Sequence, residues 1–226
     1  MRLTVYLLAT LLATLRVAAQ APALHPGDRF FGVWGGASFY APGGTRLGGT
    51  TDRDLFLAGV RAEWVLETPG PFAVAATMDA IPLAIVTRNP YYTNRVVGYA
   101  TSLRGRVALL EVTGRGPVYG GGASPLGLEL FAPRMGAVRP YFAAAAGILW
   151  FTRNTPEPET RRLNGTFELG GGLRIERTGG AGGAGAGGRY AWTLGWKFHH
   201  LSNAYTAPYN PGLDGNVIYL GVMRRR

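Results

Sequence analysis

The sequence predicts an all-β fold, an eight-stranded antiparallel up-and-down β-barrel that crosses a membrane. Three observations predict it. Eight short runs alternate apolar or aromatic residues with small or polar ones, the loops between them are rich in Gly, Pro, Asn and Asp, and the 226 residues include no cysteine. An even number of alternating strands joined by turn residues is typical of the small barrels of bacterial outer membranes.

The expected strands follow one another along most of the chain. They cover residues 29–39, 55–66, 72–86, 118–131, 139–151, 167–177, 189–201 and 216–224. Two segments fit the pattern less well. Residues 87–117 form a long connection with a hairpin pattern of its own (VVGYATSL, then RVALLEV), which leaves ten strands as an alternative. GGAGGAGAGG at 179–188 contains a GxGxxG match without a βαβ context, so we interpret it as a loop and not as a dinucleotide site.

The alternation in residues 189–202 indicates what surrounds that strand. The odd positions are mostly small or polar, and the even positions up to Phe198 are large: Tyr190, Trp192, Leu194, Trp196 and Phe198. A soluble sandwich turns its bulky face inward, but a transmembrane barrel turns that face toward lipid and keeps the polar face in its lumen. We expect the membrane barrel; a soluble lipocalin-like barrel is the alternative.

The first 19 residues have the features of a secretory signal peptide. Arg2 precedes the apolar run LTVYLLATLLATL, and VAA at 17–19 offers small residues for cleavage. We therefore expect a signal peptide over 1–19 and one outer-membrane barrel domain over 20–226. No later stretch approaches 18 uninterrupted apolar residues, so no membrane helix is expected.

The chain is strongly basic, with a formal net charge of +10 that is nearly all arginine. A basic balance is compatible with nucleic acid, an anionic membrane surface or a phosphorylated lipid as partner. Arginine's planar guanidinium suits phosphate better than an ammonium group does, which favours a phosphate-bearing partner. With both termini periplasmic, the arginines of the outer loops could meet lipid phosphates or be merely solvated: Arg46, Arg53, Arg88, Arg95, Arg104, Arg106, Arg115, Arg153, Arg161 and Arg162.

Two of the three histidines stand side by side near the end of the seventh expected strand. Residues two apart on a strand share a face with Cα atoms about 6.5–7 Å apart, so the imidazole of His200 can reach the hydroxyl of Ser202, whereas His199 points into the barrel. A serine needs a neighbouring base, and the base needs a third group to orient it. Asp214 begins the next strand of an antiparallel hairpin and can return beside His200.

Asn203 could donate a hydrogen bond to a developing oxyanion, together with backbone N–H groups of the turn that it opens. In the alternative, Asp214 is a solvated charge at the rim, and the plain turn residues are Ser202, Asn203, Asn210, Pro211 and Gly212. The proposed topology puts His200 and Ser202 at the depth of the outer leaflet.

The stretch HLSNAYTAPYNPGLDGNVIYLGV at 200–222 resembles the lipid A 3-O-deacylase family, and VYGGGASPLGLEL at 118–130 looks like a strand of the same family. The resemblance implies catalytic His200, Ser202 and Asp214, supported by Asn203 beside the serine and Asn210 in the loop. The type members carry glutamate where this chain has Asp214.

The resemblance further implies an outer-membrane serine esterase that removes the ester-linked acyl chain at the 3-position of lipid A, without a metal or other cofactor. The expected partners are lipid A or lipopolysaccharide and the membrane, with a homodimer as one possible assembly and no nucleic acid. The alternative function is a non-catalytic barrel with a structural or adhesive role.

Overall fold

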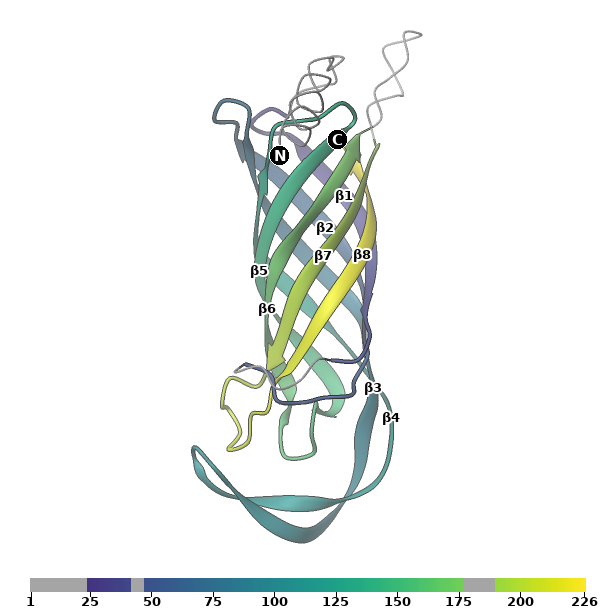
Figure 1. Cartoon of the computed structure of the whole chain (residues 1–226), viewed down its shortest axis with the longest axis vertical. Coiled ribbons are helices and arrows are strands. Elements are labelled where there is room, and N and C mark those ends of the chain that lie inside the picture. Colours follow the sequence, from purple (N-terminus) through teal and green to yellow (C-terminus); the bar gives the residue numbers. More distant parts are fainter. Residues whose placement is uncertain (1–23, 42–46, 177–189) are drawn as a thin grey trace, which may run out of the picture.

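A computed structural model describes residues 24–41, 47–176 and 190–226. They form a closed antiparallel barrel in which each strand pairs with its neighbours in the sequence and the last strand returns to the first (Figure 1). The strands are β1 (Arg29–Ser38), β2 (Leu55–Glu67), β3 (Ala73–Ser102), β4 (Gly105–Phe131), β5 (Val138–Thr155), β6 (Arg161–Glu176), β7 (Tyr190–Ser202) and β8 (Leu213–Arg225). The predicted eight-stranded barrel is confirmed. The expected signal peptide, Arg46 and the glycine tract at 179–188 lie outside the described residues.

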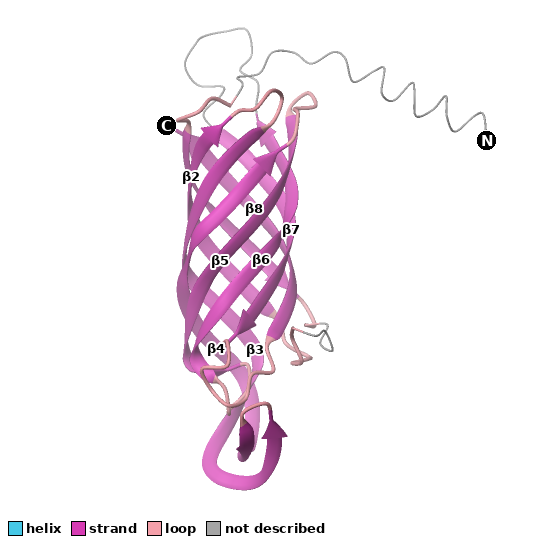
Figure 2. Ribbon diagram, turned by 90° about the vertical axis from the view of Figure 1, so that its left-hand side faces the viewer, coloured by secondary structure: helices cyan, strands magenta, loops and turns pink. Residues whose placement is uncertain are grey.

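The ten-strand alternative is wrong, because residues 87–117 extend β3 and β4 instead of forming a separate pair. One ladder runs from Ala73 opposite Phe131 to Ser102 opposite Gly105. Several register shifts interrupt it, and irregularities of this kind bend a hairpin. The extended hairpin projects beyond the other loops and curves across the end of the barrel (Figures 1 and 2).

The two faces of the barrel wall differ as the alternation predicted. Trp192 and Trp196 are 52% and 48% exposed on the outside, whereas Lys197 and His199 are 5% and 0% exposed on the inside. Exposed apolar side chains continue around the wall on the other strands, for example Leu126 at 72% and Ile218 at 64%. A soluble barrel would leave this surface in water, so the lipocalin-like alternative is wrong.

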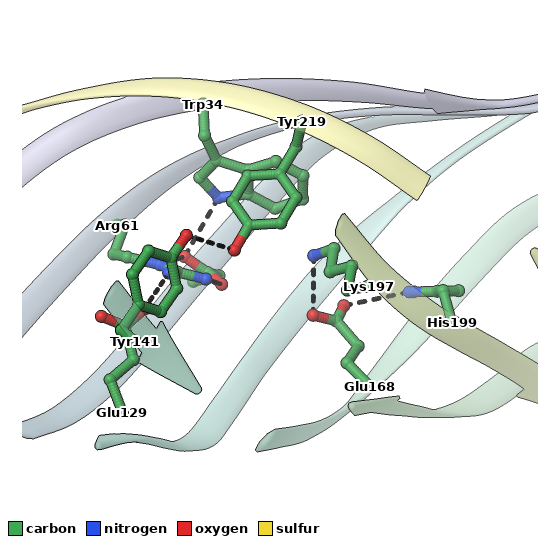
Figure 3. Close-up of polar contacts among 9 residues, drawn as sticks. Trp34, Arg61, Glu129, Tyr141, Glu168, Lys197, His199 and Tyr219 are labelled. Atoms are coloured by element: carbon green, nitrogen blue, oxygen red, sulfur yellow. Dashed lines mark hydrogen bonds and ion pairs between the residues drawn. The ribbon is translucent and has the colours of Figure 1, made fainter. Parts of the chain in front are cut away.

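The lumen is filled with paired charges rather than with a purely apolar core (Figure 3). Arg61 bonds Asp79 at 2.7 Å and also contacts Glu129, and Asp79 accepts a further bond from the Trp34 indole N–H. A second cluster joins Lys197 and His199 to one Glu168 carboxylate. Buried charges persist only when they are paired, so these networks explain how an arginine-rich chain forms a closed interior.

The beginning of β1 and the end of β8 lie at one end of the barrel, where Phe30 pairs with Arg225 and the Arg226 N–H donates to the Arg29 carbonyl. The β7–β8 loop and the β3–β4 hairpin lie at the other end (Figure 1). Residues 24–41, 47–176 and 190–226 include no helix long and apolar enough to cross a membrane.

Candidate active site

The centre of the candidate site is a hydrogen-bonded pair on neighbouring strands. His200 on β7 stands directly opposite Asp214 on β8, and its Nδ1 lies 2.7 Å from Asp214 Oδ1. An ionised carboxylate only accepts hydrogen bonds, so the ring donates from Nδ1 and its Nε2 is left as the basic atom. The two residues that the sequence placed together are therefore in contact. The alternative of Asp214 as a solvated rim charge is wrong, since the residue is 0% exposed.

Asp214 is buried although it belongs to the outward face of β8. Asn216, Ile218 and Leu220, at the same parity, are exposed. The β1–β2 loop covers the carboxylate: Thr50 forms a bridge with Leu213, and its N–H donates to the Gly212 carbonyl at 3.1 Å. We call residues 47–50 the cover loop.

Gly48 of the cover loop fits against the carboxylate only because it has no side chain. A Cβ placed there would lie 2.5 Å from Asp214 Cγ and 2.7 Å from each carboxylate oxygen. Gly212 is similarly tight, because its Cβ would lie 3.0 Å from His200 Cε1 and its φ of +62° suits glycine. Two glycines therefore enclose the His–Asp pair. Sequence reasoning missed Gly48, for which the Gly48–Gly49 pair was the only local signal.

Ser202 is the last residue of β7 and has the same parity as His200, so both project from the outer face of the wall. It stands opposite Gly165 on β6, which brings no side chain to crowd it, and it is partly exposed. No hydrogen bond joins Ser202 Oγ to His200 among the described residues. Catalytic hydrogen bonds without substrate are often long, and they tighten when substrate binds.

Asn203 and Asn210 hold the β7–β8 loop together. The Asn203 N–H donates to Asn210 Oδ1 at 3.0 Å, and Asn203 Nδ2 donates to the Tyr209 carbonyl at 2.7 Å. The Asn203 carbonyl accepts from both the N–H and the hydroxyl of Thr206. The backbone N–H that was expected to face an oxyanion is thus engaged inside the loop. The oxyanion role of the Asn203 side chain stays a prediction.

His199 points into the lumen, as its parity predicted. Its Nδ1 lies 3.0 Å from Glu168 Oε1, and Lys197 Nζ lies 2.6 Å from the other oxygen of that carboxylate (Figure 3). The neighbouring histidines are therefore bonded to different carboxylates on opposite sides of the wall. Within the described part of the chain, no cluster of three or more His, Cys, Asp or Glu residues has a geometry for binding a metal ion.

A polar cavity of about 450 Å³ lies beside the cover loop, and its lining includes Arg53, Arg115, Glu157, Tyr209 and Pro211. Arg53 is 2% exposed and pairs with Glu157 at 2.8 Å, so it is not one of the solvated arginines. Burial raises the pKa of Glu157 despite the opposing attraction of Arg53. Burial also lowers the pKa of Arg53.

Comparison with known proteins shows the family of this chain. The family model described as Lipid A 3-O-deacylase (PagL) matches residues 86–223, more than half of the chain. The chain belongs to the lipid A 3-O-deacylase family. The match spans the outer part of β3, all of β4 and the whole His200–Asp214 region. Membership together with the barrel makes this deacylase-family chain an outer-membrane protein.

A solved outer-membrane structure supports the fold of this deacylase-family barrel. The crystal structure of the outer membrane enzyme PagL aligns with a TM-score of 0.55 and 12% identity over 84% of this chain and 97% of that one. Ail, the attachment invasion locus protein of Yersinia pestis, aligns with a TM-score of 0.40 and 11% identity over 89% and 100% of the two chains. The search of curated proteins found no match. At 12% identity the likeness to the PagL structure concerns the fold alone.

Proposed function

We propose that this barrel hydrolyses the ester that links the 3-O-acyl chain to lipid A, with Ser202 as nucleophile, His200 as base and Asp214 as the orienting carboxylate. The observation that carries the proposal is the 2.7 Å His200–Asp214 bond on the membrane-facing wall, two residues from a serine of the same face. An isolated polar group that faces hydrocarbon costs free energy. A His–Asp pair that is hydrogen-bonded and covered at this place therefore indicates a functional site.

In the proposed reaction, Ser202 Oγ attacks the ester carbonyl carbon while His200 Nε2 takes its proton. The tetrahedral intermediate then collapses, the C–O bond to the sugar breaks, and the imidazolium returns the proton to the departing sugar hydroxyl. Water activated by the same histidine hydrolyses the acyl-enzyme and releases the fatty acid. Asp214 holds the ring so that Nε2 faces the serine in both steps and stabilises the imidazolium that forms.

An apolar groove of about 610 Å³ on the outer wall supports an acylated substrate. Its lining runs from Phe167 on β6 across β5, β4 and β3 to Trp64 on β2. Phe167 is the cross-strand neighbour of His200, so one end of the groove lies beside the base. Four inter-strand spacings of about 4.8 Å make the groove roughly 19 Å long, and strand tilt directs it away from the outer end toward the middle of the membrane. An extended fatty acyl chain suits both its length and its direction.

Mass spectrometry of lipid A from cells that express the protein tests the proposal. Lipid A from cells with the wild-type protein should lack one ester-linked chain, and lipid A from cells with Ser202→Ala should retain it. Ser124→Ala is a matched control, because Ser124 is a buried serine of the lumen and should not affect the reaction. If the wild-type protein folds but the lipid A is unchanged, the esterase proposal fails and the structural or adhesive role is the alternative. Full activity of Ser202→Ala would refute the assignment of Ser202 as nucleophile.

A further inference from the structure

The tip of the β3–β4 hairpin reaches the β7–β8 loop beside the candidate site. Ser102 Oγ donates to the Pro208 carbonyl at 2.8 Å, and the Arg104 guanidinium lies 5.9 Å from the centre of the Tyr205 ring. Farther along the hairpin, the Leu110 N–H donates to Glu159 Oε1 at 2.9 Å. The hairpin therefore rests on two other outer loops, and its tip has a fixed place near the residues that follow Ser202 (Figure 1).

Four arginines at this place are exposed and form no ion pair with any described residue: Arg104, Arg106, Arg161 and Arg162. Their contacts are with neutral groups. Arg106 stacks on Tyr99 at 4.7 Å, and Arg161 reaches the Thr206 carbonyl at 3.5 Å. Among the other outer arginines, Arg95 pairs with Glu111 and Arg88 with Asp54, whereas Arg115 and Arg153 also form no ion pair with a described residue. Four of the six described outer arginines without an ion-pair partner thus lie at the hairpin tip and at the start of β6.

Large apolar side chains accompany these arginines on the hairpin. Leu103 at the tip is 84% exposed, Tyr99 is 60% exposed and Val97 is 59% exposed. Water alone does not favour such exposure on a protruding hairpin, whereas the membrane interface accepts an apolar or aromatic body with a cationic head. A free anion in solution would need the arginines but not the apolar residues.

We propose that the hairpin tip and the start of β6 form a docking surface for the phosphorylated headgroup of an outer-leaflet glycolipid, with the arginines on its phosphates and Leu103 and Tyr99 in the lipid interface. The inference rests on the proposed function in one respect: the lipid docked here is the one whose acyl ester is presented to Ser202. The guanidinium fork suits phosphate geometry, and the surface potential of an anionic leaflet draws such side chains toward it.

Binding is measured first with the Ser202→Ala protein, which does not consume its ligand, held in nanodiscs of phosphatidylcholine. The probes are fluorescent bisphosphorylated lipid A and the same lipid after enzymatic removal of both phosphates. Each cation near an anionic surface contributes about a fivefold factor, which salt reduces, so Arg104→Gln with Arg106→Gln should weaken binding of the phosphorylated lipid about 10-fold at about 0.1 M salt. Binding of the dephosphorylated lipid should change less than about twofold.

Arg95→Gln is the matched control, since it removes an arginine from the same hairpin that already has a carboxylate partner, and it should change neither affinity appreciably. In protein that retains Ser202, the double substitution Arg104→Gln with Arg106→Gln should raise KM about 10-fold and leave kcat within about twofold. Equal affinity of wild type and variant, equal weakening with both lipids, or full displacement by inorganic phosphate would each overturn the docking surface. If wild type binds phosphorylated lipid through these arginines but hydrolyses nothing, the docking surface stands and the esterase proposal fails.

Discussion

The cover loop offers the sharpest test of how the candidate triad is held together. In Gly48→Ala, the new methyl carbon would lie 2.5 Å from Asp214 Cγ and 2.7 Å from both carboxylate oxygens. The backbone of Gly48 is not in a left-handed conformation, so alanine meets no conformational objection there. The closest contacts of the new methyl group are therefore with the Asp214 carboxylate.

The expected size follows from these distances. Carbon atoms prefer a separation of about 3.5 Å or more, so the carboxyl carbon must retreat by about 1 Å or the cover loop must lift by as much. Such a retreat lengthens the 2.7 Å bond from His200 beyond about 3.5 Å, where it no longer counts as a hydrogen bond. A misplacement of 1 Å at a catalytic group costs about 100-fold in rate, which corresponds to about 2.7 kcal/mol at 1.36 kcal/mol per decade.

The assay is the initial rate of lipid A hydrolysis by refolded protein in mixed micelles, with heat-modifiable gel mobility to confirm that the barrel is closed. Gly49→Ala is the control, because its Cβ would approach only the Pro211 carbonyl, at 3.3 Å. This variant should retain most activity. Asp214→Asn should lower turnover by about 10- to 1000-fold, and adding Gly48→Ala to it should cost little more, because both changes act on one bond. Wild-type turnover by Gly48→Ala, or equal losses from the two glycine variants, would refute the reasoning.

Three further predictions test the wall, the two histidines and the outer cavity. Brominated lipid should quench Trp192 and Trp196 while an aqueous quencher fails; strong aqueous quenching would contradict the membrane-facing assignment. His200→Ala should abolish hydrolysis, whereas His199→Ala should keep kcat within about fivefold and lower the unfolding free energy by about 1–3 kcal/mol, since it removes a buried partner of a carboxylate. Burial raises the pKa of Glu157, so the contribution of this group to stability is greatest below its ordinary pKa of 4.5 and is lost as the pH rises through the raised pKa. Glu157→Gln should therefore flatten that part of the profile of Tm against pH. Identical profiles for wild type and Glu157→Gln would contradict the raised pKa.

The parts of this barrel that follow a short-range pattern could be predicted from the sequence. Side chains alternate strictly along a strand, so one run of residues sufficed to separate lipid-facing Trp196 from lumen-facing Lys197. The His200–Asp214 contact was predictable for a similar reason, because a single hairpin carries both residues and its pairing brings them face to face. The resemblance to the deacylase family rested on this same hairpin.

Features that depend on distant parts of the chain could not be predicted in this way. The cover loop lies far from Asp214 in the sequence, and only closure of the barrel brings Thr50 to Leu213. The segment 87–117 shows strand-like alternation, but alternation does not distinguish a new pair of strands from a longer pair. The charge pairs of the lumen, such as Arg61 with Asp79, likewise depend on which strands become neighbours.

The contact between the cover loop and β8 makes the candidate site depend on closure of the barrel. The β7–β8 hairpin can bring His200 to Asp214 by itself, but Gly48 reaches the carboxylate only when β1 has paired with β8. Until that seam forms, the pair would stand in water, where a competing solvent weakens the bond that orients the ring. Under the proposed function, a chain whose β1–β8 seam is still open is an incomplete catalyst, and closure of that seam is the event that completes it.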